Sequence, residues 1–492
     1  MIEWTFISAF AGAAVLLLLP PHRKMLARIV ALAAACIGFG IALAAFFLFE
    51  RGAGAEPFQF VVERDWIPAL GIGFHLAADG ISLVLLLLTG VIAITGVLFS
   101  WNIEKSPKQF FALFLIIIGG AYGVFVSFDL FLFLVFYEIV ILPKYLLIAG
   151  WGSTNREYGA MKLTLYSILG SALVLAAAMA AYVVAGLGSF NLFELAGVAY
   201  APAFQAWAFP MMFLGFAVLA GIWPFHTWAP TGHVAAPTAA SMLLAGVVMK
   251  LGAYGALRVA MPFFPEGLEQ WRIPFAVLAA IGILYGALAA LAQRDLKFVI
   301  GYSSISHMGF VLLGLLTLNT LGIGGAVLQM FSHGIIAALL FAVVGRMVYD
   351  RTHTRELADL GKLRLSRALP FAAVTFTVAS AASMGLPGFS GFIAELTILL
   401  GAWDSIPLLL LLVGPGVIIT VAFTLKALQA SFFGDNTDSP GTVPALPPIS
   451  APERVGAIVL MAIALAVGLH PTPLLDLILG SFDSALMSSL LK

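Results

Sequence analysis

The sequence predicts an all-α polytopic membrane protein with about 14 transmembrane helices. Hydrophobic residues make up 62% of its 492 residues and charged residues only 10%, and the mean hydropathy is +1.07. A soluble protein needs a more polar surface than this composition can supply. Apolar segments long enough to cross a bilayer follow one another along the chain, mostly with short loops between them. These observations exclude a soluble globular fold.

The expected spans are spread over the whole chain. They cover residues 3–20, 27–49, 76–99, 110–128, 130–150, 161–187, 207–229, 237–261, 273–292, 298–317, 322–348, 368–402, 407–432 and 453–471. The net charge is zero and the basic residues are dispersed, which argues against a nucleic-acid partner. The single cysteine, Cys36, excludes a disulfide within the chain, an iron–sulfur cluster and a thiolate zinc site.

Basic residues are unevenly distributed over the expected loops. If the N-terminus lies outside, sixteen of the 24 Lys and Arg residues fall on inner connections. The five on outer connections are Arg51, Arg64, Arg258, Arg272 and Lys492. This excess predicts that both termini lie on the outer side of a bacterial or archaeal cytoplasmic membrane. The remaining three basic residues fall inside or near the ends of expected helices: Lys144, Lys250 and Lys426.

Two of the expected helices are interrupted by proline and glycine. The seventh contains Pro224 and Pro230 on either side of His226, and the twelfth contains Pro387 in the run GLPGFSG. Proline removes a helix hydrogen bond, and the carbonyl groups freed at membrane depth must face protein or water. Broken helices in matching positions of two halves are typical of transporters built from inverted repeats. Ordinary proline kinks are the alternative interpretation.

The spacing of the two breaks predicts two inverted five-helix repeats. We expect helices 1–3 in residues 1–105, the first repeat in 106–262, the second in 263–434, and the last helix with an amphipathic tail in 435–492. The longest polar connection is expected at Gly434–Pro452. The tail, Pro471–Lys492, is too short for a further span and is expected to lie along a surface.

The run from Phe128 to Trp151 contains the first candidate functional residue. Glu138 lies in the middle of this apolar segment, where an ionisable group costs about 2.5–3.5 kcal/mol on insertion scales, so we expect it to face protein or water. No charged residue lies three or four positions away. Its partner must therefore come from another helix, or the carboxyl stays protonated and can carry protons near neutral pH. A carboxyl that only caps a neighbouring backbone is the alternative.

Four further titratable residues lie within expected helices. Lys250 is too deep to reach either surface easily, so a change in its surroundings can switch its charge, although a snorkelling lysine is the alternative. His307 and His333 are flanked by apolar residues, and each taken alone is more often a hydrogen-bonded core histidine. Glu395 follows the second helix break. With Glu138, these residues form the series that a proton relay along the membrane midplane requires.

Motifs for other chemistry are absent from the sequence. We find no metal-ligand spacing, nucleotide-binding loop or nucleophile–base pair, and the dispersed glycines are typical of close helix packing. We therefore expect no metal, no cofactor and no catalytic residue in this chain.

Four runs of the sequence carry a family resemblance: FYEIVILPKYLLIAGWGSTNREYGAMKLTLYSILGS, PFHTWAPTGHVAAPTAASMLLAGVVMKLGAYGALR, AQRDLKFVIGYSSISHMGF and QMFSHGIIAALLFAVVGRMVYDRTHTRELADLGK. They resemble the antiporter-like subunits of respiratory complex I, above all the M subunit (NuoM type), which is similar in turn to the large subunits of Mrp-type cation/proton antiporters. The similarity extends from Asp79 to Gly434. The M type is indicated by Ala337, Ala338 and Glu395, where the other subunit types usually carry lysine.

The resemblance implies fourteen helices in two inverted repeats, contacted by a transverse helix from a neighbouring subunit. It implies that Glu138 is the essential fifth-helix carboxylate and Lys250 the central eighth-helix lysine. His333 would be a central-axis relay group and Glu395 the exit-side carboxylate. The chain would then be the proton-translocating subunit of a redox-driven NADH:quinone oxidoreductase, without a redox centre of its own. Its partners would be the other membrane subunits, including neighbouring antiporter-like subunits, and the lipid bilayer.

One departure from the family pattern affects the first half of the chain. The family normally has a lysine on the seventh helix, seven residues before the histidine, and this chain has Leu219 there. Glu138 would lose the charge that favours its ionised form, which predicts weakened or differently gated proton uptake in the first half. Lys144 could substitute, although six residues and Pro143 separate it from Glu138. Supporting candidates are Lys144, His226, His233 and Lys426; the motif around His233 also lacks the usual acidic residue at Gly232.

Several functional classes follow from this sequence. The first is the proton-translocating subunit just described, in NADH:quinone oxidoreductase or in a ferredoxin- or hydrogenase-linked relative. The second is a subunit of a multisubunit Mrp-type cation/proton antiporter. A structural spacer with reduced pumping is a third, because of Leu219. Neighbouring genes would separate the first two classes, and Glu138→Gln would be tolerated only by a spacer.

Overall fold

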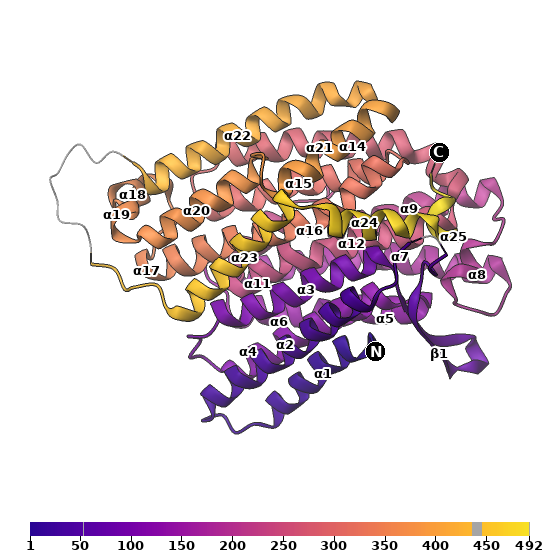
Figure 1. Cartoon of the computed structure of the whole chain (residues 1–492), viewed down its shortest axis with the longest axis horizontal. Coiled ribbons are helices and arrows are strands. Elements are labelled where there is room, and N and C mark those ends of the chain that lie inside the picture. The colour runs from indigo at the N-terminus through magenta and orange to yellow at the C-terminus, as the bar shows by residue number, and fades with distance from the viewer. Residues whose placement is uncertain (53, 435–444, 492) are drawn as a thin grey trace.

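The computed structural model describes residues 1–52, 54–434 and 445–491. Most of the predicted connection at Gly434–Pro452 lies outside these residues, and so does Lys492. The described chain forms one bundle of helices that lie side by side, with both chain ends towards the same end of the bundle (Figure 1).

The elements follow one another in a simple order. They are α1 (Glu3–Leu18), α2 (Lys24–Leu48), β1 (Gln59–Ile67), β2 (Ile72–Ala78), α3 (Gly80–Phe99), α4 (Pro107–Val126), α5 (Leu130–Ile139), α6 (Ile141–Trp151), α7 (Arg156–Ala185), α8 (Leu192–Ala196), α9 (Pro202–Ala220), α10 (Trp228–Ala235), α11 (Thr238–Leu243), α12 (Met249–Gly255), α13 (Met261–Phe263), α14 (Pro265–Ala292), α15 (Leu296–Leu315), α16 (Thr320–Ala342), α17 (Asp350–Thr352), α18 (Leu357–Lys362), α19 (Leu365–Ala368), α20 (Pro370–Ser383), α21 (Ser390–Ser405), α22 (Leu410–Phe432), α23 (Ala451–Leu469), α24 (Thr472–Gly480) and α25 (Ala485–Ser488). Three π-helical stretches continue neighbouring helices: Leu244–Val248, Ala256–Ala260 and Val343–Tyr349. Short 3-10 turns lie at Pro68–Leu70, Pro407–Leu409 and Ser481–Asp483.

The helices agree with the predicted membrane spans. In the described part of the chain, 12 helices are long and apolar enough to cross a membrane. The first predicted span falls on α1 and the twelfth on α20 and α21, and of these α1 and α20 are shorter apolar helices. The third span differs, because residues 76–78 belong to strand β2 and the helix begins at Gly80, capped by the Asp79 side chain. The prediction of a polytopic helical membrane protein is therefore confirmed.

A β-hairpin precedes the third span and was not predicted. Strands β1 and β2 pair antiparallel, with Glu63 opposite His75, and the 3-10 turn between them ends at Gly71. Gly71 has a φ of 67°, a left-handed conformation that favours glycine. The hairpin extends from the end of the bundle where both chain ends lie (Figure 1).

Both predicted helix breaks are present. Helix α9 ends at Ala220 and α10 begins at Trp228, so Pro224 lies in a non-helical segment. Likewise, α20 ends at Ser383 and α21 begins at Ser390, with Pro387 between them. In each break the chain leaves the first half-helix through a left-handed glycine, Gly221 with φ 91° and Gly385 with φ 71°. The two halves of the chain thus interrupt one span in the same way.

The fifth predicted span is not one continuous helix. It divides into α5 and α6 at Val140, two residues after Glu138. Pro143 explains the break, because proline cannot donate to the carbonyl four residues earlier and its ring clashes with that carbonyl. Glu138 and Lys144 therefore lie on the two sides of this break, one on α5 and the other on α6.

Two spans form the centre of the bundle. The most apolar stretches of Thr238–Phe263 and Thr320–Thr352 are 100% buried, whereas those of α2 and α7 are 33% buried. The central spans also carry all three π-helical stretches, which often mark functional positions in helices. Candidate residues on these two spans are therefore shielded by the chain itself.

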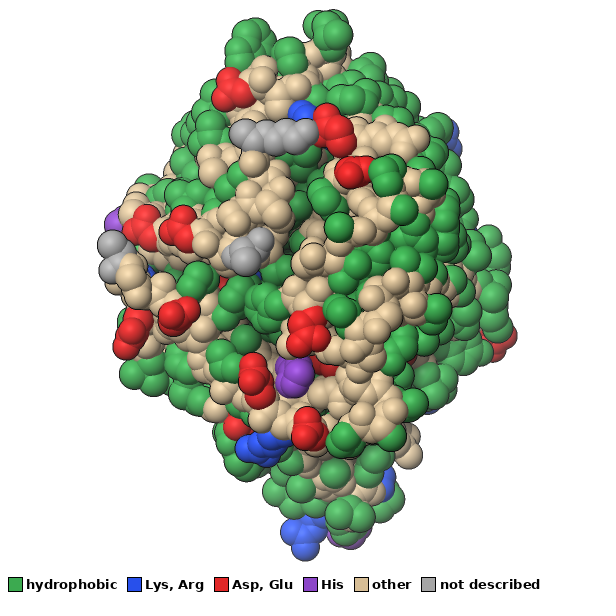
Figure 2. Space-filling view, turned by 90° about the vertical axis from the view of Figure 1, so that its right-hand side faces the viewer, with side chains coloured by type: hydrophobic (Ala, Val, Ile, Leu, Met, Phe, Trp, Pro, Cys, Tyr) green, Lys and Arg blue, Asp and Glu red, His purple; other side chains and the backbone are tan. Residues whose placement is uncertain are grey.

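The C-terminal tail lies against the bundle. Leu474, Leu477 and Ile478 of α24 are buried, and the helix packs against α3 and α16. The Ser481 hydroxyl accepts a hydrogen bond from the Ile81 amide at 3.2 Å, which joins the tail to the start of α3. Figure 2 shows the end of the bundle that carries this tail, where acidic side chains outnumber basic ones.

Candidate functional site

A continuous series of titratable side chains crosses the centre of the bundle. Lys250 Nζ on α12 lies 2.8 Å from His333 Nδ1 on α16. The ring of His333 lies 5.4 Å from that of His307 on α15, centroid to centroid. His307 Nδ1 then lies 2.9 Å from Glu395 Oε1 on α21. Four of the five predicted relay residues are thus brought together, from four different helices.

Helix irregularity positions Lys250 within this series. The residue is fully buried, and α12 lies between two π-helical stretches, Leu244–Val248 and Ala256–Ala260. Its ammonium group also donates to the Ala245 carbonyl, a group of the first π-helical stretch. A buried charged amine needs such partners, because its desolvation is otherwise uncompensated. The snorkelling alternative for Lys250 is therefore wrong.

The Glu395 end of the series includes two residues that the sequence did not single out. Gln329 Nε2 donates to Glu395 Oε1 at 3.1 Å, and Ser383 Oγ lies 3.2 Å from His307 Nε2. Gln329 lies on α16, four residues before His333, so both project from the same helix face. That spacing was the available signal for Gln329.

A small cavity lies among these side chains. It measures about 10 Å³ and is lined by His307, Gln329, His333 and Glu395, among others. This volume is close to what one water molecule requires, and the lining groups can supply its hydrogen-bond partners. A water there would bridge the two histidines, whose rings are tilted by 34° and lie 5.4 Å apart, centroid to centroid.

Glu138 occupies a separate position on the other side of the bundle. It is exposed at the surface of this chain, and its carboxylate accepts a hydrogen bond from the Ser171 hydroxyl on α7. Lys144 on α6 is buried, and its Nζ lies 3.4 Å from Ser167 Oγ on α7, the helix that also carries Ser171. Leu219, where a lysine was expected, is 5% exposed within the apolar core. In the described chain no hydrogen bond joins Glu138 to Lys250.

The supporting candidates differ in their positions. His233 is fully buried, stacks on Phe341 at 4.9 Å, and has no hydrogen-bond partner on either ring nitrogen within the described residues. His226 is buried beside the ring of Tyr285, 5.0 Å away. Lys426 is exposed and donates to the Leu291 carbonyl at 2.8 Å, so it is a contact between helix ends and not part of the central series.

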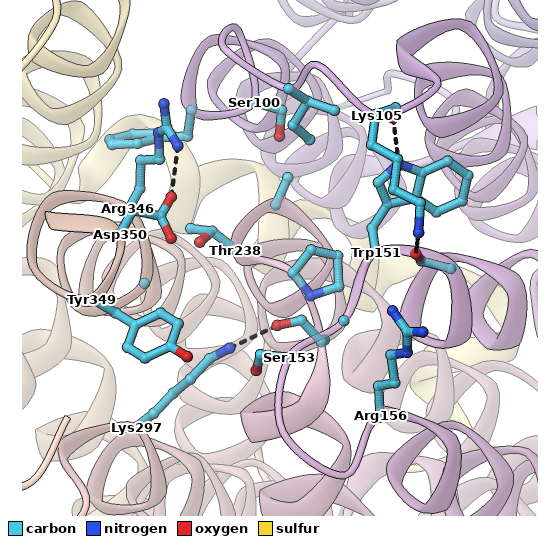
Figure 3. Close-up of a pocket in the computed structure, with 18 of the residues that line it drawn as sticks. Ser100, Lys105, Trp151, Ser153, Arg156, Thr238, Lys297, Arg346, Tyr349 and Asp350 are labelled. Atoms are coloured by element: carbon cyan, nitrogen blue, oxygen red, sulfur yellow. Dashed lines mark hydrogen bonds and ion pairs between the residues drawn. The ribbon is translucent and has the colours of Figure 1, made fainter. Parts of the chain in front are cut away.

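A larger cavity lies at the end of the bundle where the basic residues gather. It measures about 340 Å³, and Figure 3 shows Lys105, Arg156, Lys297 and Arg346 around it. Lys297 Nζ donates to the Ala236 carbonyl at 2.7 Å and to the Val234 carbonyl at 3.2 Å. The cavity therefore reaches the end of α10, the helix that carries His233 and directly precedes the central span Thr238–Phe263.

A buried ion pair corrects one sequence expectation. Arg258 was assigned to an outer connection, yet it is 1% exposed and pairs with Asp79, which is fully buried. The rings of Phe58, Phe128 and Tyr254 surround its guanidinium group. This pair joins the start of α3 to the π-helical stretch Ala256–Ala260. Arg258 is therefore part of the packed interior and not a loop residue that reports the orientation of the chain.

The bundle, its broken helices and its buried polar axis define an antiporter-like membrane subunit. The family described as NADH:quinone oxidoreductase/Mrp antiporter matches residues 127–423. The chain belongs to this family, as an antiporter-like membrane subunit of complex I of the M type (chain 4), related to Mrp antiporter subunits.

Individual relatives agree with this placement. The chain is 40% identical over 419 residues to NAD(P)H-quinone oxidoreductase chain 4 1 of Synechococcus elongatus, which covers 84% of this chain and 78% of that protein. It is 37% identical over 471 residues to NADH-quinone oxidoreductase subunit M of Rhodobacter capsulatus, covering 93% and 90% respectively. A chain of respiratory complex I from Thermus thermophilus superposes with a TM-score of 0.88 at 27% identity, covering 99% of this chain and 100% of that one.

Proposed function

We propose that this chain is the proton-pumping membrane subunit of a NADH:quinone or NAD(P)H:quinone oxidoreductase of the complex I type, and that Lys250, His333, His307 and Glu395 carry the protons. The observation that carries this proposal is the buried series itself, with contacts of 2.8 Å and 2.9 Å at its ends and a 5.4 Å ring contact between them. Ionisable residues held inside a membrane protein in mutual contact are typical of proton relays.

The relay requires alternation between charge states along the series. Lys250 and His333 compete for one proton, because an ammonium group beside a protonated imidazole is repelled by it. His307 and Glu395 attract each other when both are charged. A change in the field at one end can therefore move a proton through the water-sized cavity between the histidines. Quinone reduction elsewhere in the complex would supply that change.

Two inverted repeats provide the frame for this relay in our proposal. Residues 106–262 hold the spans α4, α5–α6, α7, α9–α10 and α11–α13, and residues 263–434 hold α14, α15, α16, α20–α21 and α22. The fourth span is broken in each set, and each break has proline and a left-handed glycine. Glu138 and His307 both lie on the second span of their set.

A neighbouring subunit is needed beside Glu138. The carboxylate is exposed on this chain near the middle of the span Leu130–Trp151, and a carboxylate facing lipid at that depth is costly. We therefore infer that another antiporter-like membrane subunit covers this face within the assembly. The basic residues around the cavity at the end opposite the chain termini support an orientation with both termini outside a bacterial cytoplasmic membrane.

The function is tested by removing the amine at the centre of the series. The assembled complex carrying Lys250→Met should still reduce quinone with NADH in proteoliposomes, but it should acidify the vesicle lumen less per electron than the parent. Lys426→Met removes an exposed lysine and serves as the matched control. Equal proton-to-electron ratios in the parent and Lys250→Met would refute the proposal. Proton movement driven by a Na⁺ gradient, without any electron donor, would instead favour the antiporter class.

A further inference from the structure

The first half of the chain contains a buried lysine without a carboxylate contact. Lys144 lies on α6, just after the break at Val140, and it is 2% exposed. Within the described residues its ammonium group has one side-chain hydrogen bond, to Ser167 Oγ at 3.4 Å. Keeping an amine inside a membrane protein costs several kcal/mol unless a charge or strong dipole compensates it. A residue held at this cost calls for a partner of opposite charge.

Glu138 supplies that opposite charge across the surface of α7. The Ser171 hydroxyl donates to its carboxylate, and Ser171 follows Ser167 by one helical turn on the same face of α7. Because Ser167 lies 3.4 Å from Lys144 Nζ, the two charged groups lie against neighbouring turns of α7, and Tyr137 is the titratable neighbour of Glu138 in the sequence. Glu138 lies on α5 and Lys144 on α6, on either side of the break, and both side chains contact α7.

The seventh span carries no residue that supplies this cation. Leu219 lies in apolar packing. The backbone around it packs closely against Gly252 of α12. A Cβ added at Gly252 would lie 2.4 Å from the Phe216 carbonyl oxygen and 3.2 Å from the Leu219 carbonyl carbon. No ionisable residue lies between Trp207 and Trp223 on this span. Lys144 is therefore the cation within the described first repeat that the structure places beside Glu138.

We propose that Lys144 takes over the role of the missing seventh-helix lysine, as the cationic partner of Glu138, with Ser167 and Ser171 holding the two charges in register. This inference rests on the proposed pumping function and names a positioning residue for it. Lys144 stabilises the ionised form of Glu138 while the pair is close, and separation of the two charges releases that stabilisation. The first half of the chain is then a working unit and not a structural spacer.

The test compares three variants of the assembled complex in proteoliposomes. Lys144→Met should lower the proton-to-electron ratio and shift the pH profile of quinone reduction, because Glu138 loses its countercharge. Adding Leu219→Lys to Lys144→Met should restore at least half of the lost ratio, since the cation returns to Glu138 from the neighbouring span. Leu142→Met, an exposed position on the same helix, is the matched control.

The outcomes separate this inference from the proposed function. If Lys250→Met stops pumping while Lys144→Met matches the parent in ratio and pH profile, the inference fails and the proposed function stands. If Lys250→Met pumps like the parent, the proposed function itself fails. Should Lys144→Met not assemble, Ser167→Ala with Ser171→Ala removes only the two hydroxyls, and a parent-like pH profile of that variant overturns the inference.

Discussion

Lys250 Nζ lies 2.8 Å from His333 Nδ1, within hydrogen-bond distance and away from any solvent. Lys250 also donates to the Ala245 carbonyl, which is a backbone group. The imidazole of His333 is therefore the only side chain that contacts the amine by a hydrogen bond in the described chain. The two residues lie on the two central spans, so any displacement of α12 relative to α16 changes this contact directly. Such a contact can act as a switch.

His333→Ala should slow proton translocation without abolishing assembly. The substitution removes the acceptor for Lys250 and interrupts the contact with His307, so the proton must cross a longer gap. We expect a fall of about tenfold or more, which corresponds to about 1.4 kcal/mol on the barrier. The initial rate of lumen acidification at equal quinone reduction measures this effect. A parent-like rate would show that protons bypass His333, and His22→Ala at an exposed turn controls for loss of a histidine.

Glu395→Gln should impair release of protons from the far end of the series. The amide keeps the size of the carboxyl and can still contact His307 and Gln329, but it cannot take up a proton. The complex should therefore assemble normally and translocate fewer protons per electron. Glu395→Asp, which retains a titratable group, should recover part of the ratio. An unchanged ratio in Glu395→Gln would place the exit elsewhere.

The sequence predicts that the relay residues lie at membrane depth, but it does not predict the side of each helix from which their side chains project. Lys250 lies in a span that is apolar all round, so no amphipathic face indicated the side on which its amine projects. The proline breaks were predictable because Pro224 and Pro387 lack the amide that a helix requires. The contact of Lys250 with His333, on a helix eighty-three residues further along, arises only from packing.

The exposed position of Glu138 and the burial of Arg258 show the same limit. Insertion cost predicts that Glu138 avoids lipid, but it cannot say whether this chain or a neighbour provides the shelter. Counting basic residues placed Arg258 in a loop, because its carboxylate partner, Asp79, lies far away in the sequence. Strand β2 was missed because its residues continue an apolar run into α3 without a change in composition.

Arg258→Met should destabilise the end of the bundle that carries the β-hairpin. It leaves Asp79 charged and buried without a cation beside it, and breaking a buried pair in this way typically costs about 3–5 kcal/mol. Combining it with Asp79→Asn should recover much of the loss, since the amide still caps α3 and carries no charge. The complex is heated in detergent, and the temperature at which this subunit is lost from it is compared between the single and the double variant. Equal midpoints for the single and double variants would contradict the prediction.

Glu104 should stabilise the connection between α3 and α4 only above acidic pH. Its carboxylate lies 2.6 Å from Lys24 Nζ and 2.7 Å from Arg28 Nη2 on α2, and hydrogen bonds from these two cations hold the pKa of Glu104 below its ordinary value of 4.5. A pKa that is lower in the folded protein means that the contribution is complete above the ordinary value and disappears as the pH falls through the lowered one. Glu104→Gln should therefore unfold at a lower temperature than the parent near pH 7. The two curves should converge as the pH falls below 4.5. Glu56→Gln is the control, because Glu56 is exposed and forms no ion pair within the described residues, so this variant should follow the parent at every pH. A constant offset for Glu104→Gln across the whole range would show that its ion pairs contribute nothing.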